Sequence, residues 1–364
     1  MSPPPLPPFS VIATVRNEKE SIAAFVDSLL AQTLAPAEIV IVDGASTDGT
    51  LDILQRYARD GHIALISQDC NISEGRNLGI AAASHEWIAA TDAGCRAEPD
   101  WLEQLARAAV GEEAPDVIAG NYAFETHNDF ELASVLATDA PDREDSDQAR
   151  YYPSSRSIAF RRSAWNTVGG YPEWLYAAED TLYNIRLREL GLRFTFARDA
   201  RVWWRPRQTL HGLYRQYFNY ARGNGRIGLA LYGYWSNIKT HGYVAGFALL
   251  GLLHPGFLIA AIAVGVSHVR RNLWPQARLA GPRTGRAAMI WKTLWLMEVV
   301  RVAGMHGFLA GRSDRRKDPR FIREQLAWMG RDSLETEPAV FGWQARLLVV
   351  ASVAAAAFIA WQRT

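Results

Sequence analysis

The stretch EIVIVDGASTDGT, residues 38–50, decides the fold class of this chain. Its apolar run stops at Asp43 and leads into a turn of small residues. This pattern is typical of a buried parallel strand that presents a carboxylate at one edge of a sheet. Residues 86–102, EWIAATDAGCRAEPDWL, repeat the pattern with Asp92. Because ligands of open α/β sheets bind at the carboxyl ends of strands, the two acids predict a nucleotide pocket.

Strands and helices alternate on both sides of this stretch, which predicts a mainly parallel sheet flanked by helices. Ser46 and Thr47 are expected to cap the second helix. Strands are expected over residues 10–15, 38–43, 62–67, 87–92 and 116–121, and helices over 18–32, 50–59, 76–83 and 99–110.

After Tyr122 this rhythm breaks. Residues 139–150 are densely charged and predict a mobile surface loop, and Gly169–Pro172 predicts a tight turn. Short strands are expected over residues 157–161, 194–198 and 201–205, and helices over 163–168 and 179–190.

Length, charge and cysteine content narrow the class of protein. The chain has 364 residues, which predicts one large domain with an appendage, and its net charge of +1 argues against a general nucleic-acid binder. Cys70 and Cys95 are too few for a disulfide framework and lack partners at metal-ligand spacing, so we interpret both as small buried residues. Residues 1–9 form a proline-rich arm without the regions of a signal peptide, so we expect the following domain to stay in the cytoplasm.

The last third of the chain carries two long runs without charged side chains, residues 243–269 and 347–361. A bilayer core needs about 20 apolar residues of helix, so membrane helices are expected in these runs. Residues 287–310 contain charges among apolar residues and are expected to lie along the membrane interface or on the first run.

Two basic clusters follow the first apolar run, and short loops rich in lysine and arginine stay cytoplasmic. We therefore hypothesise that residues 243–269 form a re-entrant helical hairpin that breaks at Pro255 and Gly256, with both ends inside. A buried core helix is the alternative interpretation. The clusters comprise Arg270, Arg271, Arg278, Arg283 and Arg286, and then Arg312, Arg315, Arg316, Lys317, Arg320 and Arg323.

Three side chains of the first half have the chemistry of a nucleotide site. Asp43 is suited to accept a hydrogen bond from a base N–H. Asp92 is suited to face a ribose or a divalent cation such as Mg²⁺ or Mn²⁺, which prefers oxygen ligands. Arg76, at a loop-to-helix entry, has the planar fork that suits phosphate. The alternatives are a polar strand end for the acids and an ordinary surface position for the arginine.

Residues 10–225 resemble a family 2 glycosyltransferase of the GT-A fold, the nucleotide-diphospho-sugar transferase fold. The resemblance implies a nucleotide-binding half over 10–121, an acceptor half over 122–225, and a membrane-associated region over 226–364. The matching pieces, in order, are SVIATVRNE, SLLAQTLAPAEIVIVDGASTDGT, GRNLGI, TDAGCRAEPDWL, VGGYPEWLYAAED and QYFNYARGNG.

The resemblance also implies roles for individual residues. Asp180, in the pair Glu179-Asp180, matches the acid that serves as general base in an inverting displacement at the anomeric carbon. His211 and Arg222 are candidates to contact the diphosphate, with ordinary surface contacts as the alternative. The residues matched to the donor nucleotide are Thr14, Asn17, Glu18, Asp43, Arg76 and Asp92.

Three departures from the family pattern matter. Gly94 stands where the second acid of the Asp-x-Asp motif is usual, which leaves metal binding by Asp92 open, and Gly44 replaces a second aspartate after Asp43. The Gln-x-x-Arg-Trp signature of processive members is absent, which favours transfer of a single sugar.

The resemblance predicts an inverting glycosyltransferase at the cytoplasmic membrane face. It would move one sugar from a nucleotide-diphosphate sugar to a lipid-linked or cell-surface glycan acceptor. One alternative is a catalytically weak, membrane-anchored protein that binds sugar nucleotides, against which Glu179-Asp180 argues. The other is a nucleotidyltransferase, but residues 13–21 lack the glycine- and lysine-rich phosphate loop that such an enzyme usually needs.

Overall fold

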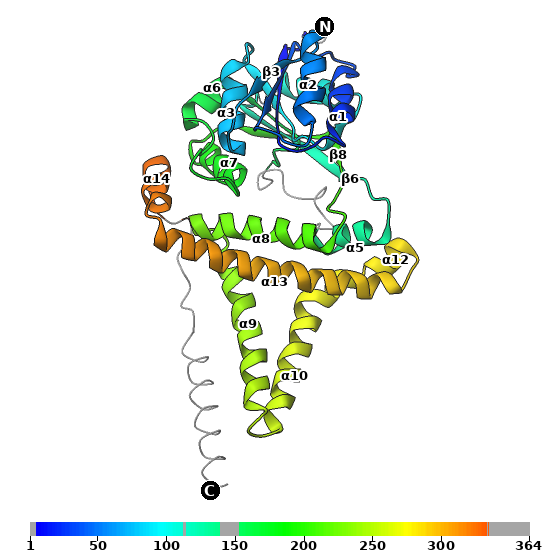
Figure 1. Cartoon of the computed structure of the whole chain (residues 1–364), viewed down its shortest axis with the longest axis vertical. Coiled ribbons are helices and arrows are strands. Elements are labelled where there is room, and N and C mark those ends of the chain that lie inside the picture. Colours follow the sequence, from blue (N-terminus) through cyan, green and yellow to red (C-terminus); the bar gives the residue numbers. More distant parts are fainter. Residues whose placement is uncertain (1–4, 112–113, 139–152, 333, 335–364) are drawn as a thin grey trace. The chain divides into compact units, whose positions relative to one another are not determined.

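The computed structural model describes residues 5–111, 114–138, 153–332 and 334. The chain forms two compact units (Figure 1). The first unit contains residues 1–127 and 140–206, and the second contains 128–139 and 207–364. Residue 225, the expected end of the catalytic domain, lies inside the helix Leu210–Ile227 of the second unit.

The first unit is built on one eight-stranded sheet with the strand order β3-β2-β1-β4-β7-β6-β8-β5. Every strand predicted from an apolar run is present. The bounds are β1 Phe9–Val15, β2 Glu38–Asp43, β3 Ala64–Ser67, β4 Trp87–Ala90, β5 Cys95–Ala97, β6 Val117–Phe124, β7 Ile158–Arg161 and β8 Phe194–Trp204.

The parallel part of the sheet positions the strand-end acids. β1 pairs in parallel with β2 on one side and with β4 on the other, and β2 pairs in parallel with β3. Most residues of β1, β2 and β4 are buried, as expected for strands covered on both faces. The carboxyl ends of β2 and β4 therefore flank the end of β1 at one edge.

The rest of the sheet corrects the expectation of a mainly parallel arrangement, because the sheet is mixed. β7 runs antiparallel to β4 and β6, and β5 runs antiparallel to β8. β8 is one strand rather than the two expected, and its parallel pairing with β6 continues past an irregularity between Ala119 and Asn121. A strand of three or four residues such as β5 or β7 is too short for its pattern to indicate direction.

Helices pack against the sheet through apolar faces. The core contains the side chains of Trp101, Leu102 and Leu105 of α4, which are completely buried. It also contains Phe25 and Leu29 of α1, each with at most 1 % of its surface exposed. Cys70 and Cys95 are buried free thiols, as predicted. The helices of this unit are α1 Ile22–Leu30, α2 Thr50–Arg59, α3 Ile72–Ala82, α4 Trp101–Ala109, α6 Arg162–Val168 and α7 Glu179–Glu189.

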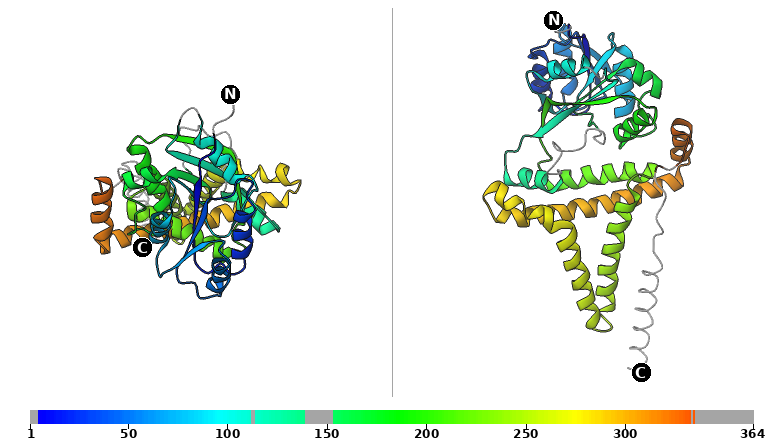
Figure 2. Two further views of the ribbon diagram at one scale, coloured as in Figure 1. Left: turned by 90° about the horizontal axis from the view of Figure 1, so that it is seen from above. Right: turned by 180° about the vertical axis from the view of Figure 1, so that it is seen from behind.

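The second unit is helical, and two long helices, α8 and α13, run side by side (Figure 2). α8 covers Leu210–Ile227 and α13 covers Ala288–Lys317, so the segment expected over 287–310 is part of a longer helix. A Cβ atom at Gly307 or Gly311 would lie 2.0 Å from the carbonyl oxygen of Phe218 or 2.1 Å from that of Arg222. Only glycine allows the two backbones to approach this closely.

The apolar run 243–269 is divided between two helices, and the expected break at Pro255 and Gly256 is present. α9, Leu231–Leu250, and α10, Gly256–His268, form a hairpin with the break beside Pro255 (Figure 1). The described part of the chain contains no helix with the length and apolar character needed to cross a bilayer. The predicted segment 347–361 and the charged loop 139–150 lie outside the described residues.

Shorter helices complete the second unit. Asp129 of α5 forms ion pairs with Arg286 at 2.6 Å and with Lys292 at 2.9 Å, which joins this short helix to the start of α13. The remaining elements are α5 Asp129–Thr138, a π-helical stretch Val269–Leu273, α11 Trp274–Ala277, α12 Ala280–Thr284 and α14 Arg320–Met329.

Candidate active site

Asp43 is the last residue of β2, and its side chain is fully buried. Its Oδ2 accepts hydrogen bonds from the Ser46 backbone N–H at 3.1 Å and from Ser67 Oγ at 3.3 Å. Its Oδ1 is buried without a hydrogen-bond partner among the described residues. Leaving a buried carboxylate oxygen without a donor costs free energy, so Oδ1 is the atom that a ligand N–H would satisfy.

The turn after β2 is fastened to the loop after β1. The Asn17 N–H donates to Ser46 Oγ at 2.9 Å, and Asn17 Oδ1 accepts from the Thr47 N–H at 2.8 Å. The capping role expected for Ser46 and Thr47 is therefore wrong. The residue before α2 is Gly49, which has no side chain to cap the helix. Asp48 Oδ1 instead accepts a hydrogen bond from the first N–H of the helix at 3.0 Å.

Arg76 of α3 joins two of the predicted acids. Its side chain is 4 % exposed, and it donates through Nη2 to Asp92 Oδ1 at 2.9 Å and through Nη1 to Glu179 Oε1 at 2.7 Å. Its guanidinium carbon lies 5.3 Å from the centre of the Tyr171 ring. Burial opposes the charge of Arg76, but Asp92 and Glu179 outweigh burial and raise the pKa of the guanidinium above its usual range. Arg76 is therefore a fixed cation within the site.

Glu179 and Asp180 begin α7 and differ in their surroundings. The Glu179 side chain is 8 % exposed. Burial raises the pKa of Glu179 to about 7, with the neighbouring Asp180 adding to the rise and Arg76 opposing it. Asp180 is half-buried, and its Oδ1 accepts from the Thr181 N–H at 2.7 Å. The preceding Ala178 has a φ of 64°, a left-handed conformation that is uncommon for alanine and costs free energy.

Asn77 holds the turn before α7, a role that sequence analysis does not identify. Its Oδ1 accepts from the Tyr171 N–H at 2.8 Å and from Trp165 Nε1 at 3.0 Å, and its Nδ2 donates to the Tyr171 carbonyl at 2.9 Å. Gly170 has a φ of 83°, and a Cβ atom there would lie 2.9 Å from Asn77 Oδ1. The only available signal was an amide side chain next to Arg76.

Glu18 lies beside the glycine that replaces the usual second acid. Gly94 has a φ of 89°, and a Cβ atom there would lie 3.4 Å from Glu18 Oε2. Glu18 Oε2 also accepts from Ser21 Oγ at 2.8 Å. Thr14 is half-buried near the end of β1. The Oγ1 of the buried Thr91, which precedes Asp92, has no hydrogen-bond partner among the described residues.

The two remaining candidates, His211 and Arg222, belong to α8 of the second unit. Arg222 donates through Nε and Nη2 to the two oxygens of Asp314, at 2.7 and 3.1 Å, and this fork joins α8 to α13. His211 is exposed and lines a hollow of about 480 Å³ together with Trp295. Their contact with a diphosphate stays a prediction.

Comparison with solved structures identifies the fold. The mannosyltransferase PcManGT from Pyrobaculum calidifontis, in complex with GDP-Man and Mn²⁺, superposes with a TM-score of 0.50 at 18% sequence identity, covering 82% of this chain and 87% of that chain. The mixed sheet with acids at its parallel strand ends is thus a GT-A-like glycosyltransferase fold.

Sequence comparison shows the family. Residues 10–167 match the family described as Glycosyl transferase family 2. A PGL/p-HBAD biosynthesis glycosyltransferase of Mycobacterium bovis (strain BCG / Pasteur 1173P2) is 31% identical over 190 residues, which cover 50% of this chain and 69% of that protein. The succinoglycan biosynthesis protein ExoA of Rhizobium meliloti (strain 1021) is 27% identical over 305 residues, 78% of this chain and 92% of that protein. The chain belongs to glycosyl transferase family 2 and is a glycosyltransferase.

Proposed function

We propose that this enzyme moves a single sugar from a nucleotide-diphosphate sugar to an acceptor hydroxyl, with inversion at the anomeric carbon. The observation that carries the proposal is the pair of features at one edge of the sheet. Asp43 offers a buried acceptor without a donor, and the Arg76 cation joins Asp92 to the acid pair that begins α7. A nucleotide base needs a hydrogen-bond acceptor such as Asp43, and a reacting sugar phosphate needs a cation and an acid such as those beside α7.

The donor is bound through its base and its phosphates. Asp43 Oδ1 accepts an N–H of the base, and Thr14 lies near the same strand end. Arg76 supplies a positive charge that is already desolvated and held by two carboxylates, so little reorganisation is needed when negative charge grows on the leaving diphosphate.

Asp180 is the general base that takes the proton from the acceptor hydroxyl. It is more exposed than Glu179, which is buried against Arg76. A base must come within hydrogen-bond reach of a substrate, so accessibility favours Asp180. Glu179 instead positions the guanidinium, and the turn held by Asn77 positions both acids.

The residues at the strand ends also fit a divalent cation. Asp92 and Glu18 supply carboxylate oxygens, which Mg²⁺ and Mn²⁺ prefer, and Glu18 lies next to Gly94, where the usual second acid is missing. A bound cation would supply further positive charge to the diphosphate. The Mn²⁺ in the complex of PcManGT supports this assignment. Replacing Glu18 with glutamine is expected to raise the Mn²⁺ concentration needed for donor binding.

The acceptor is a lipid-linked or cell-surface glycan at the cytoplasmic face of the membrane. The relative named for succinoglycan biosynthesis supports a glycan product. Large apolar side chains on the α9–α10 hairpin support contact with lipid. The most exposed aliphatic side chains are Leu252 at 83 %, Ile259 at 71 %, Leu249 at 67 %, Ile262 at 65 % and Val266 at 60 %. The hairpin would enter the bilayer from one side and return, leaving the following arginines in the cytoplasm.

The test is sugar transfer by the full chain in detergent or nanodiscs. A panel of UDP-, GDP- and dTDP-sugars is offered with a polyprenyl phosphate or a membrane-lipid extract, with and without Mg²⁺ or Mn²⁺. Asp180→Asn is expected to abolish transfer while nucleotide binding persists, and Asp52→Asn, on the exposed side of α2, serves as the matched control. Full transfer by Asp180→Asn would refute the assignment of the base.

A further inference from the structure

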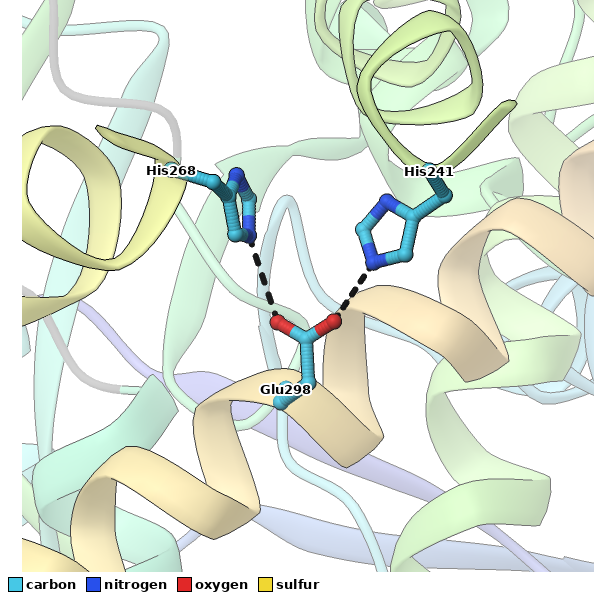
Figure 3. Close-up of side chains that lie close together, drawn as sticks. All are labelled: His241, His268 and Glu298. Atoms are coloured by element: carbon cyan, nitrogen blue, oxygen red, sulfur yellow. Dashed lines mark hydrogen bonds and ion pairs between the residues drawn. The ribbon is translucent and has the colours of Figure 1, made fainter. Parts of the chain in front are cut away.

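Three helices of the second unit bring His241, His268 and Glu298 together (Figure 3). They come from α9, α10 and α13, and one potential ligand atom of each lies within 4.8 Å of the others. His241 Nε2 is 2.5 Å from Glu298 Oε1, and His268 Nε2 is 3.3 Å from Glu298 Oε2. The glycosyltransferase site proposed above uses none of these residues.

The hydrogen bond on the far side of the His241 ring determines where its proton lies. Nδ1 is 2.8 Å from the backbone carbonyl oxygen of Asn237, which can only accept. Nδ1 therefore carries hydrogen, and in the neutral ring Nε2 presents a lone pair to the carboxylate of Glu298. At 2.5 Å a single proton lies between the two atoms. A metal ion, which would bind each ligand atom at about 2.0–2.2 Å, would replace this proton and move the two atoms apart.

His268 is buried and is also held from behind. Its Nδ1 lies 3.1 Å from the side-chain amide of Asn272. If the oxygen and nitrogen of the Asn272 amide exchange places, the oxygen accepts a hydrogen bond from a proton on His268 Nδ1. The lone pair of His268 Nε2 is then available to a metal ion. Arg301 donates to Asn237 Oδ1 at 3.1 Å and to the Asn272 carbonyl at 2.9 Å. Both residues behind the histidines are thus fixed, as is usual for imidazoles that bind metals.

We propose that His241, His268 and Glu298 form a site for a divalent transition metal ion of the Zn²⁺ class. Two imidazole nitrogens and one carboxylate oxygen are a common protein ligand set for Zn²⁺, whereas Mg²⁺ and Ca²⁺ prefer oxygen ligands alone. Solvent supplies the fourth ligand. Glu298 lines a hollow of about 480 Å³ whose wall also includes His211 and Trp295. Water or a small anion can reach the site through this hollow.

The bound ion would fasten the apolar hairpin to the long helix α13. His241 precedes the turn of the hairpin and His268 is the last residue of α10, so both ligands lie away from the turn. One ion would then hold both arms of the hairpin against α13. This role is structural and independent of sugar transfer, so failure of the transferase proposal leaves it intact.

The experiment uses the full chain, stripped with a chelator and then titrated with Co²⁺ or Zn²⁺. With Co²⁺ we expect visible d–d absorption that saturates at about one equivalent, and with Zn²⁺ a rise in melting temperature of about 5 °C or more. The variants His241→Gln and His268→Gln are expected to lose both signals. His306→Gln, an exposed histidine on α13, is expected to keep them.

The wild-type Co²⁺ spectrum tests the proposal even where a variant fails to fold. Absence of the spectrum in folded wild-type protein, together with no Zn²⁺-dependent shift in melting temperature, would overturn the site and leave a protonated histidine–carboxylate pair. Equal Co²⁺ spectra in wild type and in a folded His268→Gln variant would also overturn it.

Discussion

Replacing Glu179 with glutamine tests the electrostatics of the site. The carboxylate of Glu179 is buried and accepts a hydrogen bond from Arg76 at 2.7 Å. Glutamine has nearly the same shape and keeps an oxygen for that bond, but it cannot ionise. The variant therefore isolates the effect of placing a negative charge at this buried position beside Asp180.

The sign of the effect follows from the pKa of Glu179, which burial raises from its ordinary 4.5 to about 7. A raised pKa means that the protonated form favours folding. This contribution is fully present below about pH 4.5 and is lost as the pH rises through 7. The difference between the ordinary and the raised pKa of Glu179 corresponds to roughly 3 kcal/mol of unfolding free energy. Glu179→Gln should match wild type near pH 4.5 and be more stable by up to about 3 kcal/mol at pH 8.

The assay is urea denaturation at several pH values, followed by pulse-labelling of thiols. Cys70 and Cys95 are the two cysteines of the chain and both are buried in the first unit, so labelling reports the unfolding of that unit alone. Glu20→Gln, an exposed acid, is the control and should show the pH dependence of wild type. Parallel stability curves for Glu179→Gln and wild type from pH 5 to pH 8 would refute the reasoning.

Three further predictions address the nucleotide site, the helix crossing and the hairpin. Asp43→Asn should raise the dissociation constant of the donor about tenfold in calorimetry, because an amide N–H replaces an acceptor, and unchanged affinity would contradict this. Gly311→Ala should lower the stability of the second unit by about 1–3 kcal/mol in thermal unfolding. Gly233→Ala should not, because a Cβ atom at that position would meet no neighbouring atom within 4 Å. The pair Leu252→Glu and Ile259→Glu should weaken sedimentation with anionic vesicles about 100-fold, and undiminished binding would exclude the hairpin from the lipid contact.

The parallel half of the fold could be predicted because its pattern is local. β2 and α2 have the bounds expected from the sequence, since an uninterrupted apolar run and an amphipathic helix each leave a periodic signal. β5 was missed, because three residues carry almost no periodicity. β7 was predicted as a short strand, but its four residues did not indicate that it runs antiparallel to β4. The charged residues Arg198 and Asp199 within β8 resembled a turn, and they fall where its pairing with β6 is interrupted, between Phe196 and Arg201.

The candidate site could be predicted residue by residue but not as an arrangement. Asp43, Asp92 and the acids of α7 each stood out through local context. Nothing local indicates that Arg76 bonds to Glu179, which is 103 positions away, because that pairing depends on how α7 is placed beside α3. The cluster of His241, His268 and Glu298 was missed for the same reason, since it depends on which helix faces meet.

The most direct measurement is a crystal structure of the protein with an unreactive analogue of its nucleotide-sugar donor. We predict a base N–H within hydrogen-bond distance of Asp43 Oδ1, phosphate oxygens beside Arg76, and the anomeric carbon facing Asp180. A donor bound elsewhere, or one that leaves Asp43 Oδ1 without a hydrogen bond, would contradict the proposed site.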